Sequence, residues 1–173
     1  MLSTTRRIAL DAMLSAMFVC LSLISISLPN MKITLDALPV LVAAVLLGPL
    51  DGLAVGLIGS FLNQLLTYGL SMTTALWILP AGVRGLLVGL YAKRHGFALS
   101  RKQLLMITIL TAVLVTVLNT LIMFLDSRII GYPFAATLPT VFFRIISGIL
   151  TAILFSFLLP PLIKALQKFA KKT

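Results

Sequence analysis

Two arginines lie within apolar stretches of the sequence, where charged side chains are rare. Arg84 stands in "LPAGVRGLLVG" and Arg144 in "VFFRIISGIL". An arginine at the centre of a membrane costs about 2.5–3.5 kcal/mol on insertion scales, so each side chain requires a polar partner, a water-filled cavity or an anionic ligand. We favour ligand contact for Arg144, which is expected in the outer third of its helix, and an internal partner for Arg84, which is expected near the middle of its helix.

Four further residues could complete a site for a flat, polar ligand. Asn63, Gln64 and Asn119 offer planar hydrogen-bonding amides, and Trp77 offers an aromatic face for stacking. All four are expected at a similar outer depth. Interhelical hydrogen bonding is the competing interpretation of the amides, and an aromatic-belt anchor is that of Trp77.

Charged residues also occur in the two segments that we expect to be outer loops. Lys32 and Asp36 lie in the first, and Asp126, Arg128 and Tyr132 in the second. As solvated loop residues they need no function. As a lid they would close over an outward-facing pocket, and Lys32 or Arg128 would attract an anion.

Several kinds of chemistry lack the residues that they need. His95 is the single histidine and Cys20 the single cysteine, so we expect no metal site, no catalytic nucleophile and base pair, and no cofactor. The chain has no phosphate-binding G-x-x-x-x-G-K-[ST] motif. No carboxylate is expected deep in a span, where a proton or sodium relay would be. Uphill transport would therefore draw its energy from another chain.

The composition indicates whether these residues lie in a soluble protein or in a membrane protein. Of 173 residues, 60% are hydrophobic, the mean hydropathy is +1.15, and four carboxylates occur. A soluble domain could not bury so much apolar surface, so the sequence predicts an all-α integral membrane protein in which residues 1–173 form a single domain. Because one span needs about 20 residues, we expect about six transmembrane helices.

The basic residues predict the orientation of these helices. The net charge of +10 would suggest a nucleic-acid partner in a soluble protein, but here the charges gather beside apolar segments, so no nucleic-acid partner is expected. The positive-inside rule places three clusters in the cytoplasm, which requires an even number of spans between them and puts both termini inside. The clusters are Arg6 and Arg7; Lys93, Arg94, Arg101 and Lys102; and Lys164, Lys168, Lys171 and Lys172.

Proline, glycine and the basic clusters set the expected helix ends. The first helix is expected to end before Pro29, and the fourth to be interrupted at Pro80. The expected helices cover residues 7–27, 40–48, a third stretch ending near 68, then 75–93, 103–125, and a last stretch from about 140 into the basic tail.

One segment resembles a known family. Residues 37–69, "ALPVLVAAVLLGPLDGLAVGLIGSFLNQLLTYG", resemble the second and third helices of the folate-type substrate-binding S-components of energy-coupling factor (ECF) vitamin transporters. The similarity extends over essentially the whole chain. It implies a six-helix S-component bundle in the bacterial cytoplasmic membrane that binds a vitamin from outside, with folate first and pantothenate or riboflavin as the alternatives.

The resemblance also implies partner chains. Ala9, Ala12 and Ala16 recur at helical spacing in "ALDAMLSAMF". By itself this small-x-x-x-small pattern favours packing within the bundle. In S-components such alanines dock onto a membrane-embedded T-component driven by two ABC-type ATPases. The resemblance further implies that the S-component topples in the membrane and releases its ligand inward during ATP turnover.

Three other function classes remain open at this point. The first is an autonomous small-solute permease or channel that requires no ATPase partner. An intramembrane enzyme and a purely structural assembly subunit are the others. Transport in vesicles without other proteins would indicate the permease.

Overall fold

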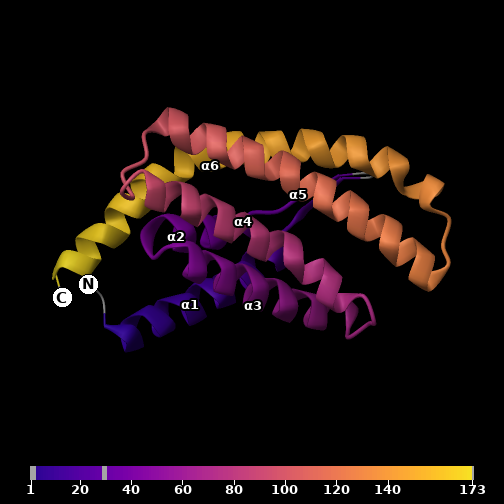
Figure 1. The fold of residues 1–173 in the computed structure, drawn as a ribbon, viewed down its shortest axis with the longest axis horizontal. Coiled ribbons are helices and arrows are strands. Elements are labelled where there is room, and N and C mark those ends of the chain that lie inside the picture. The colour runs from indigo at the N-terminus through magenta and orange to yellow at the C-terminus, as the bar shows by residue number, and fades with distance from the viewer. Residues whose placement is uncertain (1–2, 29–30, 173) are drawn as a thin grey trace.

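The structure, a computed structural model, describes residues 3–28 and 31–172, with side chains for residues 3–25, 34–135 and 139–166. It is a bundle of helices with one short hairpin between the first two (Figure 1). The helices are α1 (Thr4–Leu23), α2 (Ala37–Leu46), α3 (Pro49–Tyr68), α4 (Thr74–Arg94), α5 (Arg101–Ile130) and α6 (Leu138–Lys172), with the 3-10 turn η1 (Phe134–Thr137) before α6. The hairpin pairs β1 (Ile26–Leu28) with β2 (Met31–Ile33) in antiparallel register.

Four of the described helices are long and apolar enough to cross a membrane, namely α3, α4, α5 and α6. The ten residues of α2 rise about 15 Å, half of the roughly 30 Å hydrocarbon layer, so α2 cannot cross it alone. The first half of α1 carries Arg6, Arg7 and Asp11. Six complete spans and the cytoplasmic location of both termini therefore stay predictions.

The segment after α1 differs from the expected loop. Helix α1 ends at Leu23 rather than residue 27, and the next residues form the hairpin, in which Ser27 is opposite Lys32. The run "ISISL" alternates apolar and polar residues with a period of two, the pattern of a strand. This alternation, rather than proline alone, accounts for the early end of α1.

Two other helices also differ from the expected ones. Helix α4 continues through Pro80 instead of being interrupted there. Helix α5 begins at a capping box formed by Ser100 and Gln103 and continues to Ile130, past the expected end at residue 125. It ends where Gly131 adopts a left-handed φ of 91° and donates its N–H to the Ser127 carbonyl, a usual helix stop.

Glycines bring α3 and α4 into backbone contact. A Cβ added at Gly85 would lie 2.0 Å from the carbonyl oxygen of Gly52, and one added at Gly56 would lie 2.5 Å from that of Ala81. Small residues allow such close approach in membranes, where packing rather than the hydrophobic effect drives helix association. The α3–α4 seam thus fixes the centre of the bundle.

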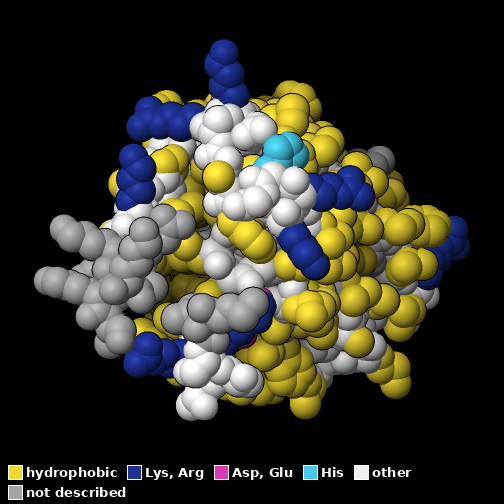
Figure 2. Space-filling model, turned by 60° about the vertical axis from the view of Figure 1, so that its left-hand side comes forward, with side chains coloured by type: hydrophobic (Ala, Val, Ile, Leu, Met, Phe, Trp, Pro, Cys, Tyr) yellow, Lys and Arg dark blue, Asp and Glu magenta, His cyan; other side chains and the backbone are white. Residues whose placement is uncertain are grey.

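An ion pair joins α1 to α3 at one end of the bundle. The Arg7 guanidinium binds both carboxylate oxygens of Asp51, with Nε 2.7 Å from Oδ1, and donates from Nη2 to the Leu47 carbonyl at 2.9 Å. The carboxylate is 6% exposed. The two termini and the α4–α5 connection lie at this same end, where Figure 2 shows Lys and Arg side chains around the rim.

Candidate binding cavity

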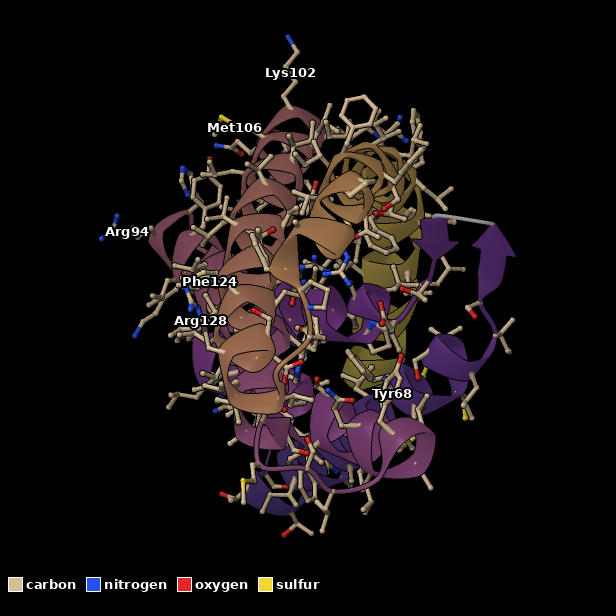
Figure 3. The ribbon with its side chains drawn as sticks, turned by 90° about the vertical axis from the view of Figure 1, so that its right-hand side faces the viewer. Tyr68, Arg94, Lys102, Met106, Phe124 and Arg128 are labelled. Atoms are coloured by element: carbon tan, nitrogen blue, oxygen red, sulfur yellow. The ribbon has the colours of Figure 1, made fainter. Side chains whose placement is uncertain are left out.

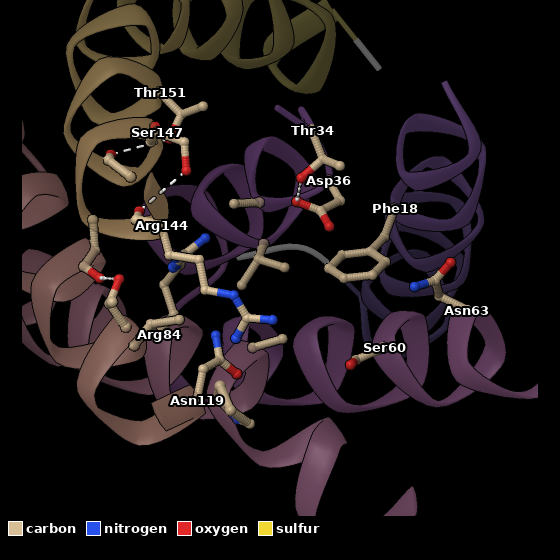
Figure 4. Close-up of a pocket in the computed structure, with 18 of the residues that line it drawn as sticks. Phe18, Thr34, Asp36, Ser60, Asn63, Arg84, Asn119, Arg144, Ser147 and Thr151 are labelled. Carbon is tan, nitrogen blue, oxygen red and sulfur yellow. Dashed lines mark hydrogen bonds between the residues drawn. The ribbon is translucent and has the colours of Figure 1, made fainter. Parts of the chain in front are cut away.

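A cavity of about 270 Å³ lies inside the bundle, with lining residues from all six helices and from the segment between β2 and α2 (Figure 4). Its apolar wall includes Phe18, Val40, Val115 and Phe155. The polar lining residues, together with Trp77, are Thr34, Asp36, Ser60, Asn63, Arg84, Thr116, Asn119, Arg144, Ser147 and Thr151.

The two arginines converge in this cavity from different helices. Arg84 extends from α4 and Arg144 from α6, and their guanidinium groups point into the same space (Figure 4). Within the part of the chain that the structure describes, neither guanidinium has a hydrogen bond or an ion pair. The internal partner that we favoured for Arg84 is therefore not found among the described side chains.

Asp36 supplies the negative charge on the cavity lining. It accepts a hydrogen bond from Thr34 Oγ1 at 2.9 Å, and its charge acts on Arg84 across the cavity. The groups that act on Arg144 are instead the side chains of Tyr68 and Tyr132, and no carboxylate is among them. One carboxylate faces two guanidinium groups, so the lining has a net positive charge that suits an anionic ligand.

The two asparagines contribute in different ways. Asn119 of α5 lies beside the arginines in Figure 4, and its amide has no hydrogen bond among the described groups. The Asn63 Oδ1 atom accepts from Ser22 Oγ at 2.7 Å and Thr67 Oγ1 at 3.2 Å. Asn63 therefore joins α1 to α3 while it also lines the cavity, so the interhelical interpretation holds for its oxygen.

Two of the expected site residues are not placed in the cavity. Gln64 is absent from the described lining, and its Oε1 atom is buried without a hydrogen-bond partner among the described atoms. Consecutive residues on a helix point about 100° apart, and on α3 it is Asn63 rather than Gln64 that contributes to the lining. The Lys32 side chain lies outside the described residues.

The second expected loop is largely helical and does not line the cavity. Asp126 lies in α5, is 7% exposed, and accepts a hydrogen bond from the Tyr132 hydroxyl at 2.9 Å. Burial, together with this bond to a carboxylate, raises the pKa of Tyr132 above its usual value. Arg128 is exposed on the last turns of α5. Tyr132 and Asp126 thus contact each other at the end of α5, and none of these three residues lines the cavity that holds the arginines.

Several lining residues were not predicted from the sequence, although the spacing of two of them from Arg144 indicated a shared helix face. Ser147 and Thr151 follow Arg144 at intervals of three and seven residues, which places them on the same helix face. Ser147 Oγ donates to the Arg144 carbonyl at 3.1 Å. No local pattern marked Phe18 or Ser60, because their positions depend on how α1 and α3 pack.

The alanines of α1 lie on the surface of the bundle. Ala9, Ala12 and Ala16 are all exposed, so this face does not pack within the described chain. In this respect the structure differs from the interpretation of the pattern as internal packing.

Solved structures that resemble this fold include S components of ECF transporters. FolT bound with folic acid has a TM-score of 0.70 at 20% identity, covering 92% of this chain and 97% of that chain. The S component of a bacterial ECF transporter gives 0.64 at 22%, covering 98% and 99%, and the S-component for biotin gives 0.51 at 19%, covering 91% and 94%. At these identities the likeness shows the fold.

Two sequence comparisons complete these findings. A UPF0397 protein of Streptococcus pneumoniae is 39% identical over 82 residues, which are 46% of this chain and 43% of that protein, so the match spans less than half of this relative. The family model described as "ECF-type riboflavin transporter, S component" matches residues 2–168. The chain therefore belongs to this family of membrane-embedded transporter subunits, which is not an enzyme class.

Proposed function

We propose that this chain binds a vitamin from outside a bacterial cell with high affinity and delivers it through association with a T-component and two ABC-type ATPases. Family membership and the S-component fold support this proposal. The site comprises Arg144, Arg84, Asn63, Trp77, Asn119 and Asp36, which all line the cavity.

The observation that carries the proposal is the pair of arginines, without hydrogen-bonded carboxylates among the described residues, that line one cavity. A ligand with an acid group would neutralise this charge and accept several charge-assisted hydrogen bonds. Folate and pantothenate carry such groups, whereas riboflavin does not. The cavity volume of about 270 Å³ lies just below the usual range of about 300–1,000 Å³ for ligand pockets. Pantothenate, which is smaller than folate, is therefore an equally good candidate ligand.

The first experiment is mass spectrometry of small molecules released from the gently purified protein, followed by titration with folate, pantothenate and riboflavin. A vitamin at near-stoichiometric amount would support the proposal and name the substrate. A protein that is empty and binds none of the three would contradict it. Uptake into vesicles that contain no other protein would favour a permease instead.

The Arg144→Ala variant should lose affinity for the acid vitamin by about 30-fold or more, because loss of one partner of a buried charge pair costs at least about 2 kcal/mol. Isothermal titration of the purified variant measures this loss. Arg94→Ala, which changes an exposed arginine outside the cavity lining, is the matched control and should bind as wild type. Unchanged binding by a folded Arg144→Ala protein would remove Arg144 from the site.

The exposed alanine face of α1 supports the proposed contact with a T-component. Ala12→Leu should reduce co-purification with that partner by about tenfold or more while ligand affinity stays unchanged, because a larger side chain prevents close helix approach. Ala75→Leu, at an exposed position at the start of α4, is the control. Equal co-purification of all three proteins would show that these alanines do not form the interface.

A further inference from the structure

A second hollow lies on the outside of the bundle, between α5 and α6. It has a volume of about 410 Å³ and an almost wholly apolar wall. Val117, Leu121 and Phe124 of α5 line it together with Val141 and Ile145 of α6. Val117 and Leu121 are 59% and 54% exposed, so the described chain leaves this groove open.

The length of the groove matches one leaflet of a membrane. Its lining on α5 extends from Val113 to Phe124, which corresponds to about 16 Å along the helix axis. The hydrocarbon layer is about 30 Å thick, so one leaflet contributes about half of it. Both helices are among the four that are long and apolar enough to cross a membrane.

An arginine, Arg128, lies beyond the end of the groove that is nearer the C-terminal end of α5. Arg128 follows Phe124 by one helical turn, and its guanidinium carbon is 5.3 Å from the centroid of the Phe124 ring (Figure 3). Arg128 is exposed and has no ion pair or hydrogen bond with the described residues. Gly131 ends the helix three residues later, so Arg128 lies in the last turn of this candidate membrane span.

We propose that this groove holds one acyl chain of an anionic membrane phospholipid and that Arg128 binds the headgroup phosphate. The apolar wall fits the chain, and the guanidinium fits the phosphate, which it can contact through two parallel hydrogen bonds. Thr116 lines both the groove and the internal cavity, so a chain in the groove packs against the outer side of the cavity wall. The proposal is independent of which vitamin the cavity binds.

Native mass spectrometry of delipidated protein, titrated with dioleoylphosphatidylglycerol, tests this site. Wild-type protein should retain one phospholipid. Val117→Trp fills the groove and should abolish this retention. Arg128→Ala should weaken it about fivefold, the effect of one arginine at an anionic membrane surface. Arg128→Lys should keep most of the binding.

Matched controls lie on the same helix outside the groove. Leu110→Trp places the same large side chain at an exposed apolar position, and Arg101→Ala removes an exposed arginine at the other end of α5. Both should retain the lipid as wild type does. Equal retention by Val117→Trp or Arg128→Ala would overturn the proposal, as would a second copy of the chain in place of the lipid. Thermal unfolding verifies the fold, and Leu121→Trp replaces Val117→Trp if that protein does not fold.

Discussion

The α3–α4 seam and the α5–α6 seam are built on different packing. At the first, an added Cβ at Gly85 would lie 2.0 Å from the Gly52 carbonyl oxygen, so backbone lies against backbone. At the second, an added Cβ at Gly148 would lie 3.7 Å from the Ala112 Cβ atom and 3.8 Å from Thr116 Oγ1, which are ordinary contacts. Both seams border the cavity, but the second also borders the apolar groove on its other side.

The helices of the bundle thus fall into two groups that are held in different ways. Helices α1, α3 and α4 are held by glycine contacts and by the Arg7–Asp51 ion pair. Helices α5 and α6 close the other side of the cavity and carry Asn119 and Arg144 (Figure 4). If the cavity changes shape around a ligand, we expect α5 and α6 to move, because backbone contacts hold α3 and α4 together.

The largest effect is expected from Gly85→Ala. Its methyl group would overlap the backbone of Gly52, which cannot move away as a flexible side chain could. Overpacking costs about 1–3 kcal/mol in well-packed interiors and more where backbone must shift, so we expect about 3 kcal/mol or more, or failure to fold. Thermal unfolding in detergent measures it. A midpoint equal to that of wild type would show that this seam can open.

Arg7→Ala should have the next largest effect, because it leaves the buried Asp51 carboxylate without the cation and donors that bind it. An unsatisfied buried acceptor costs about 1–3 kcal/mol. The double variant Arg7→Ala/Asp51→Asn removes the uncompensated charge and should recover part of the loss in the same unfolding measurement. No recovery would mean that Asp51 is stabilised by something other than Arg7.

The smallest effect, with the opposite sign, is expected from Gly148→Ala. The site has room for a methyl group, and replacing a glycine within a helix by alanine stabilises by about 0.5–1 kcal/mol. The unfolding midpoint should therefore rise slightly. Because Gly148 also lines the cavity, ligand affinity should fall modestly. A loss of stability comparable to that of Gly85→Ala would remove the distinction between the two seams.

Much of the helical architecture could be read from the chain. The apolar stretches indicated a helical membrane protein, and Ser100, Gln103 and Gly131 explain the ends of α5 once its length is known. The hairpin was not predicted, because the expected end of the first helix rested on Pro29 and not on the period-two alternation in "ISISL". Six spans were expected from the chain length and from the positions of the basic clusters, and they stay a prediction. The second helix was expected to be short, at residues 40–48, and α2 has ten residues, Ala37–Leu46.

The candidate site was predicted in part. Arg84, Arg144, Asn63, Asn119, Trp77 and Asp36 were chosen by residue type, and all six line one cavity. Gln64 was included with Asn63, but it is absent from the described lining. Phe18 and Ser60 could not be chosen, since their contribution depends on the rotation of α1 and α3 against each other.

The sequence by itself determined the membrane class, the clustering of basic residues at particular segments and the presence of two costly arginines in apolar surroundings. Only the tertiary structure decided that Arg84 and Arg144 share one cavity without hydrogen-bonded carboxylates, and that an open groove lies behind α5 and α6. The physical reason is that the composition of a helix determines whether it is more stable in water or in lipid. The direction of each side chain depends on helix rotation and separation, which distant glycine contacts set.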